Sequence, residues 1–237
     1  MSIAENIAQV RAEIARVCRE VGRDPQEITL VGASKMNDAA ACREAIAAGI
    51  DALGENRVQE MTAKLEQGAY EGAPLHFIGH LQRNKVGKVV GRVALIQSVG
   101  SLELLEEIQR VAAARDVVQD LLLEVNIGAE EAKSGFLAGN VLAAAQRAAE
   151  LPNVRVRGLM TIPPADAQRE ENMRYFREVR ALYVDMNEKL FHNELEYLSM
   201  GMSGDYQDAI RAGANMVRVG TAIFGATLIL SLISSPL

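Results

Sequence analysis

Short apolar runs alternate with helical patterns along this 237-residue chain, and no other feature constrains its fold as much. The expected strands are 28–34, 52–54, 75–78, 93–98, 120–126, 154–160, 195–199 and 216–219. Strands that alternate with helices form parallel sheets, because each crossover helix returns the chain to the same end of the sheet. Eight such units in this length predict an α/β fold, a single (β/α)8 TIM barrel.

Helical spacing also precedes the first strand. The pattern predicts helices over 2–21, 39–48, 58–66, 85–90, 102–114, 137–150, 166–189 and 206–212. Ser2 and Glu5 form a capping box, so the first of these is an extra helix at the N-terminus. A doubly wound open sheet is the alternative, but Ala33-Ser34-Lys35 lacks the glycine-rich turn that a dinucleotide site requires.

No linker divides the chain, so we expect one barrel domain over 1–226. The segment 227–237 is an apolar tail that is too short to span a bilayer, and its disposition stays open. The N-terminus has no apolar signal region, and Cys18 and Cys42 fall in helical patterns as reduced cysteines. These features predict a cytoplasmic protein without a membrane segment.

Charge and histidine content exclude two classes of partner. The net charge of −6 gives no basic surface for nucleic acid. The three histidines, His76, His80 and His192, form no zinc pattern, so no metal is expected.

Lys35 stands where the first buried strand ends and a strand-to-helix turn begins. Ligands of α/β folds bind at this end of the strands. A lysine there is a candidate for a desolvated amine that forms Schiff bases, or else a strand-end lysine that extends to solvent.

Two loops rich in small residues and hydroxyls follow the last two strands, at 199–203 and 220–222. Barrels often bind phosphate at these positions, where Gly201 and Gly220 let the backbone approach an anion and Ser199 and Thr221 donate. The alternative is that Gly220 serves only as a turn residue.

Arg218 lies within an apolar strand, where a charge needs a partner or a ligand. A salt bridge, for example with Glu124, is the structural alternative. Asn56, after the second strand, lies at the same barrel mouth or caps a helix. A planar aldehyde with a phosphate unites these features: Lys35 forms the imine, the loops hold the phosphate and Arg218 approaches the ring. Pyridoxal 5′-phosphate fits this description.

Seven sequence blocks carry a family resemblance that covers residues 2–225 in order. They are V-G-A-S-K (31–35), G-E-N-R-V-Q-E (54–60), H-F-I-G-H-L-Q-R-N-K (76–85), V-N-I-G…K-S-G (125–135), R-G-L-M-T-I (157–162), L-S-M-G-M-S-G-D (198–205) and V-R-V-G-T-A-I-F-G (217–225). The chain resembles the YggS/PROSC family of pyridoxal-phosphate-binding proteins, which is itself similar to the barrel domain of alanine racemase. Two departures are Gly204, where many relatives carry a bulkier or polar residue, and the apolar end after 225.

The resemblance implies a role for each candidate residue. Lys35 is the Schiff-base lysine, Arg218 faces the pyridine nitrogen, and Asn56 lies near the cofactor. The phosphate cup and its loop comprise Ser199, Met200, Gly201, Gly220 and Thr221.

The favoured function is a carrier, active in vitamin B6 and amino-acid homeostasis, that holds pyridoxal phosphate as a lysine aldimine without strong turnover. Apo-enzymes that use this cofactor are its expected recipients, and the chain is expected to be a monomer. A low-activity amino-acid racemase is one alternative, although the second base of that family comes from a separate domain. A Schiff-base aldolase acting on a sugar phosphate is the other.

Overall fold

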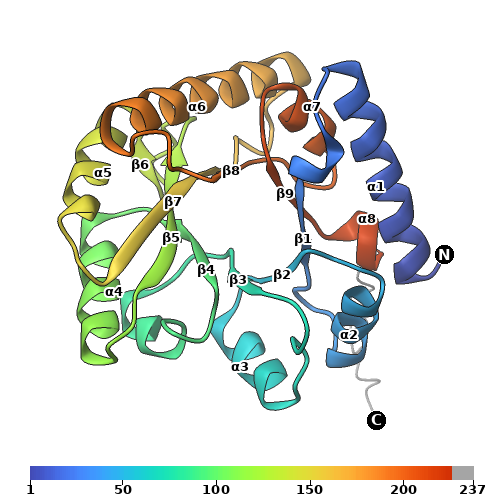
Figure 1. The fold of residues 1–237 in the computed structure, drawn as a ribbon, viewed down its shortest axis with the longest axis horizontal. Helices are drawn as coiled ribbons and strands as arrows, with labels where there is room; N and C mark the ends of the chain where they lie inside the picture. Colours follow the sequence, from blue (N-terminus) through green and yellow to red (C-terminus); the bar gives the residue numbers. More distant parts are fainter. Residues whose placement is uncertain (226–237) are drawn as a thin grey trace, which may run out of the picture.

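The structure, a computed structural model that describes residues 1–225, is a closed parallel barrel ringed by helices (Figure 1). The barrel strands are β1 (Thr29–Ala33), β2 (Ala52–Glu55), β3 (Leu75–Phe77), β4 (Leu95–Val99), β5 (Gln119–Asn126), β7 (Val154–Thr161), β8 (Tyr197–Ser199) and β9 (Met216–Val219). They are ordered β4-β3-β2-β1-β9-β8-β7-β5, and pairing of β4 with β5 closes the ring. The barrel prediction is confirmed and the open sheet is excluded. The predicted tail 227–237 lies outside the described residues.

The chain between β5 and α5 (Val141–Ala149) differs from the prediction. A helix was expected over 137–150, but a two-residue strand, β6 (Phe136–Leu137), comes first and pairs with the end of β5. Gly135 turns the chain at φ +115°, and the buried Phe136 ring then fixes it beside the barrel. The expected helix over 85–90 is a 3₁₀ helix, η2 (Arg83–Lys88).

The remaining helices comprise predicted ones, which follow their predicted ranges closely, and three short ones of three or four residues that were not predicted as separate helices. They are α1 (Ile3–Glu20), α2 (Ala39–Ala47), α3 (Val58–Glu66), α4 (Leu102–Ala114), α6 (Arg169–Leu190), α7 (Tyr206–Arg211) and α8 (Thr221–Phe224), with short 3₁₀ turns η1 (Pro25–Glu27) and η3 (Ala138–Asn140). The predicted capping box of α1 is present, since Ser2 Oγ accepts from the Glu5 amide and the Glu5 carboxylate accepts from the Ser2 amide. Within residues 1–225, no helix combines the length and the apolarity that crossing a membrane requires.

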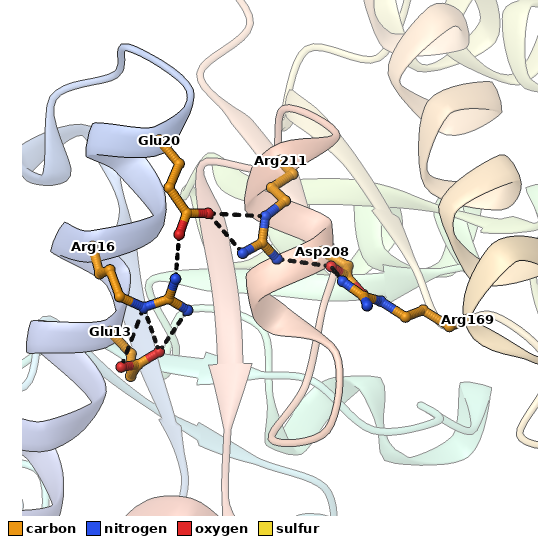
Figure 2. A network of polar contacts seen from close by, with 6 residues as sticks. All are labelled: Glu13, Arg16, Glu20, Arg169, Asp208 and Arg211. Carbon is orange, nitrogen blue, oxygen red and sulfur yellow. Dashed lines mark hydrogen bonds and ion pairs between the residues drawn. The ribbon is translucent and has the colours of Figure 1, made fainter.

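Ion pairs join α1 to α7 and α6 on the outside of the barrel (Figure 2). Arg211 of α7 lies between Glu20 of α1 and Asp208, and Arg169 of α6 pairs with the same aspartate at 2.6 Å. The hydrogen bond from Arg169 is the main reason that the pKa of Asp208 lies below its ordinary value. Such pairs are individually weak at a surface. Together they fasten α7, which follows the loop after β8, to its neighbouring helices.

Two apolar cores occupy the two faces of the sheet. The larger core packs the strands against the helices, and the smaller fills the inside of the barrel. The inner core contains Val31, Ala52, Leu95, Leu122, Met160 and Met216. Because successive strand residues face opposite sides, the next inward positions after Leu95 and Met216 are Gln97 and Arg218. The interior therefore becomes polar toward the carboxyl ends of these strands.

Gly158 marks a bulge in β7. The register with β5 shifts between Leu121 and Leu122, so that Arg157 is the extra residue. Gly158 has φ +152°, and a Cβ there would lie 1.7 Å from the Tyr197 carbonyl oxygen of β8. Only glycine allows the two strands to pair at this point.

We predict that Gly158→Ala lowers the free energy of unfolding by about 3 kcal/mol or more, because a main-chain oxygen cannot yield as a flexible side chain does. Urea unfolding measures the loss. Gly139→Ala is the matched control, since a Cβ at Gly139 meets nothing within 4 Å. Equal stability of the two variants would contradict the bulge assignment.

Candidate functional site

Lys35 follows β1 at the carboxyl end of the barrel, as predicted, but its side chain is exposed. The expectation that a buried strand would desolvate this amine is therefore wrong, and the strand-end alternative describes its surroundings. Among residues 1–225 no hydrogen bond or ion pair engages its ammonium group. The amine is available to react at the barrel mouth.

The residues on both sides of Lys35 are held firmly. Ser34 donates from Oγ to Glu55 Oε1 at 2.6 Å and from its amide to the Gly54 carbonyl. The Met36 amide donates to Glu60 Oε1 at 2.5 Å, and Met36 has a left-handed backbone with φ +61°. The lysine thus has an exposed side chain on a turn that hydrogen bonds hold in place.

A buried ion pair stands behind this turn. Lys64 of α3 donates to the Ser34 carbonyl at 2.8 Å, to Glu55 at 2.7 Å and to Glu60 at 2.8 Å. Burial lowers the pKa of Lys64, but its bonds to Glu55 and Glu60 outweigh burial and raise that pKa overall. Tyr70 also donates to Glu55, and burial followed by the charge of Glu55 raises the pKa of its phenol. Glu55 is therefore a structural anchor of the turn and does not face the mouth.

Arg218 is buried inside the barrel with 3% of its surface exposed. It donates to Ser199 Oγ at 2.5 Å and to the Thr161 carbonyl at 2.9 Å. Burial lowers its pKa to about 10, and the charges of Asp205 and Glu124 oppose this. The salt bridge with Glu124 that the sequence left open is not formed; Glu124 instead accepts from Ser134 at 3.0 Å. A buried cation among neutral acceptors can still receive a partner.

Ser199 at the end of β8 and the two residues after it are three predicted residues in three different environments. Ser199 is fully buried, with its hydroxyl between Arg218 and Gln97. Met200 packs in the helix-facing core, and its amide donates to the Met216 carbonyl. Gly201 has φ +95°, and a Cβ there would lie 2.6 Å from that of Ala209. The absent side chain of Gly201 makes room for α7, so the approach of this backbone to an anion stays a prediction, and the side chains of Ser199 and Met200 are buried.

The loop after β8 also contains a residue that sequence reasoning did not select, Ser203, which contacts the loop after β9. Ser203 Oγ accepts from the amides of Gly220 at 3.1 Å and Ala222 at 3.4 Å. Thr221 is exposed as the first residue of α8 and lines a cavity of about 590 Å³ between α8 and α1 together with Ser203. Sequence reasoning could have selected Ser203 because it lies only four residues after Ser199, in the same run of small residues.

Asn56 joins residues from the other side of the mouth. It lines a cavity of about 230 Å³ with His80, Glu124, Lys133 and others. Its Oδ1 is buried and lacks a hydrogen-bond partner in the part of the chain that the structure describes. Burial raises the pKa of Glu124 in the same cavity. An acceptor without a donor is the kind of group that a ligand hydroxyl satisfies.

Comparison with known proteins places this geometry in context. Residues 4–228 match the family model of the alanine racemase N-terminal domain. The chain is 41% identical over 225 residues to the pyridoxal phosphate homeostasis protein of Aquifex aeolicus, covering 95% of this chain and 98% of that one. It is 37% identical over 227 residues to the protein of that name from Escherichia coli K12, covering 94% and 96%.

Two solved structures resemble this chain in fold. PipY of Synechococcus elongatus PCC7942, in a structure titled with PLP bound, superposes with a TM-score of 0.82 at 34% identity, covering 94% of this chain and 100% of that one. Alanine racemase of Clostridium difficile 630 superposes with a TM-score of 0.69 at 16% identity, covering 92% of this chain and 57% of that one. The second likeness concerns the fold alone.

We predict that Lys64→Met destabilises the protein by about 3–5 kcal/mol, because it leaves the Glu55 carboxylate buried without its cation. Adding Glu55→Gln removes that charge but keeps an acceptor for Ser34 and Tyr70, so the double variant recovers part of the loss. Chemical denaturation measures both. Lys88→Met, at an exposed lysine, is the control and shifts stability by less than about 0.5 kcal/mol. A double variant no more stable than Lys64→Met refutes the pairing.

Proposed function

The chain belongs to the family of the pyridoxal phosphate homeostasis proteins, built on the alanine racemase N-terminal domain, and from this premise we propose that it binds pyridoxal 5′-phosphate at the barrel mouth. It holds the cofactor as a Schiff base with Lys35 and serves vitamin B6 and amino-acid homeostasis. The observation that carries the proposal is an exposed, unengaged lysine amine at the mouth of a barrel whose interior contains a guanidinium without an ion pair.

The groups at the mouth fit this cofactor. Pyridoxal phosphate supplies an aldehyde for a lysine amine, a phosphate and a ring nitrogen that accepts a hydrogen bond. Lys35 has a free amine on a fixed turn, and Asn56 has an acceptor without a donor. Arg218 donates to two neutral acceptors, Ser199 Oγ and the Thr161 carbonyl, and has further N–H groups that can donate to a ligand. The proposed set is Lys35, Asn56, Ser199, Met200, Gly201, Arg218, Gly220 and Thr221, in which Ser199 and Met200 act through the positions of Arg218 and the loop.

Arg218 favours holding the cofactor over converting substrates with it. A guanidinium donates hydrogen bonds and does not give up its proton, so it keeps a facing ring nitrogen unprotonated. An unprotonated ring is a weak electron sink. We therefore place this chain among carriers, and a low-activity amino-acid racemase is the second candidate.

Three finer points belong to the same proposal. Apo-enzymes that need pyridoxal phosphate are the recipients, the protein acts as a monomer, and it works in the cytoplasm. The free thiols of Cys18 and Cys42 support a reducing compartment. Light scattering tests the monomer, and activation of an apo-enzyme by the loaded protein, compared with free cofactor, tests transfer.

We predict that the protein loaded with pyridoxal phosphate has a visible absorbance band, and that borohydride fixes the cofactor to Lys35 alone. Mass mapping of the modified peptide checks the position. Lys35→Ala loses the band and keeps weaker, non-covalent binding through the phosphate loops. Lys133→Ala is the control, because Lys133 also lines the mouth but is paired with Glu130. A colourless protein whose lysine is instead trapped by a sugar phosphate supports the aldolase, and labelling of Lys133 overturns the assignment of Lys35.

We also predict no useful turnover of amino acids. The loaded protein is incubated with single enantiomers of alanine in heavy water, and chiral analysis and mass spectrometry follow inversion and deuterium uptake. One misplaced acid or base typically costs about 10²–10⁴-fold in rate. Sustained inversion with a kcat of order 1 s⁻¹ or more would promote the racemase.

A further inference from the structure

A continuous chain of hydrogen bonds crosses the inside of the barrel beneath the proposed cofactor site. It runs from His76 on β3 through Gln97 on β4 and Ser199 on β8 to Arg218 on β9, and all four side chains are buried. Gln97 Nε2 lies 3.0 Å from His76 Nδ1, Ser199 Oγ lies 2.7 Å from Gln97 Oε1, and Arg218 Nη1 lies 2.5 Å from Ser199 Oγ. The chain joins strands from opposite sides of the barrel.

Arg218 and the orientation of the Gln97 amide, which presents Oε1 to Ser199, together fix the direction of every bond in this chain. A guanidinium only donates, so Ser199 Oγ accepts from it and uses its single proton toward Gln97 Oε1. The Gln97 amide nitrogen then donates to His76 Nδ1, and its other contact is Met216 Sδ at 3.2 Å. His76 must therefore be neutral, with its proton on Nε2. Burial lowers the pKa of His76 to about 4, which agrees with that state.

We propose that Gln97 and Ser199 are positioning residues for Arg218, holding its guanidinium in one orientation toward the barrel mouth. Ser199 supplies one acceptor and the Thr161 carbonyl a second, on the neighbouring strand. Two acceptors fix the plane of a guanidinium, so its remaining N–H groups keep one direction. Gln97 makes Ser199 an obligatory acceptor by taking its proton. The link from Arg218 to a cofactor ring rests on the proposed function, but the orientation of Arg218 does not.

A role in packing alone does not explain these residues. The layer directly below is apolar, with Leu95, Leu122 and Met216 among its members. A leucine at position 97 would continue that layer without the desolvation cost of an amide. The polar chain instead links one amide, one hydroxyl and one guanidinium, and each bond between them pairs a donor with an acceptor.

Nitrogen NMR of the arginine side chains tests the proposal without cofactor. In the wild type the Nη groups of Arg218, identified by their loss in Arg218→Lys, give separate signals because rotation of the guanidinium is hindered. Gln97→Leu and Ser199→Ala are expected to merge these signals. Gln119→Leu is the matched control, since Gln119 is equally buried but bonds only to Val93, Gly91 and Asp120. Separate signals that persist in both test variants overturn the proposal.

His76 gives a second readout that needs only folded wild-type protein. The other ionisable groups that line the same cavity as His76 are Arg11, Asp51 and Tyr197. We expect the Nε2–H tautomer and no titration above pH 5. Gln97→Glu places a carboxylate against Nδ1 and raises the pKa of His76 by more than one unit, whereas Gln119→Glu leaves it unchanged. A wild-type His76 with its proton on Nδ1 contradicts the bond direction and overturns the proposal, even where a variant does not fold.

Cofactor binding separates this inference from the function on which it builds. Gln97→Leu is expected to raise the dissociation constant of pyridoxal phosphate by about tenfold or more, the scale of one hydrogen bond to a charged group. Gln119→Leu is expected to leave this dissociation constant unchanged. If the wild type itself binds no pyridoxal phosphate, the proposed function fails while the NMR result stands. If the wild type binds and Gln97→Leu binds equally well with merged Arg218 signals, the orientation of Arg218 does not serve the cofactor.

Discussion

A guanidinium inside a barrel can neither lose its proton nor accept a hydrogen bond, and the interior is arranged around that constraint at Arg218. Below it, side chains are apolar; beside it, Ser199 and the Thr161 carbonyl present oxygen. The direction of each neighbouring bond follows from the donors of Arg218 and from the orientation of the Gln97 amide. Arg218 on β9 therefore determines which polar groups surround it at the carboxyl end of the barrel.

Two buried cations are balanced in opposite ways. Lys64 lies between sheet and helix, where Glu55 and Glu60 neutralise it and the pair holds the turn that carries Lys35. Arg218 lies inside, with neutral acceptors and only distant help from Asp205 and Glu124. The first cation completes the scaffold. The second leaves uncompensated positive charge next to the mouth, which favours an electron-rich occupant.

The sequence predicted the elements whose signal is local. Apolar runs bounded by turns located the barrel strands, and strand ends placed Lys35, Asn56 and Arg218 at one mouth. β6 was missed because two residues beside a glycine carry no periodicity. Gln97 was missed because its partner Ser199 lies 102 residues further along the chain. Lys64 was missed because a lysine four residues after Glu60 on a helix usually forms a solvent-exposed pair, and only the fold buries this one. Met200 faces the helices because successive side chains alternate between the two faces of a strand and Ser199 faces inward. The loop sequence did not reveal which of the two faces inward.

Ser203 has a consequence for how readily the mouth exchanges an anion. Its hydroxyl already serves the amides of Gly220 and Ala222. An arriving phosphate that used these amides would displace the hydroxyl, and on departure the hydroxyl would return. Affinity then measures the difference between two states in which the amides of Gly220 and Ala222 each have an acceptor. Such internal competition lowers the free-energy cost of releasing the anion, which suits the carrier function that we propose.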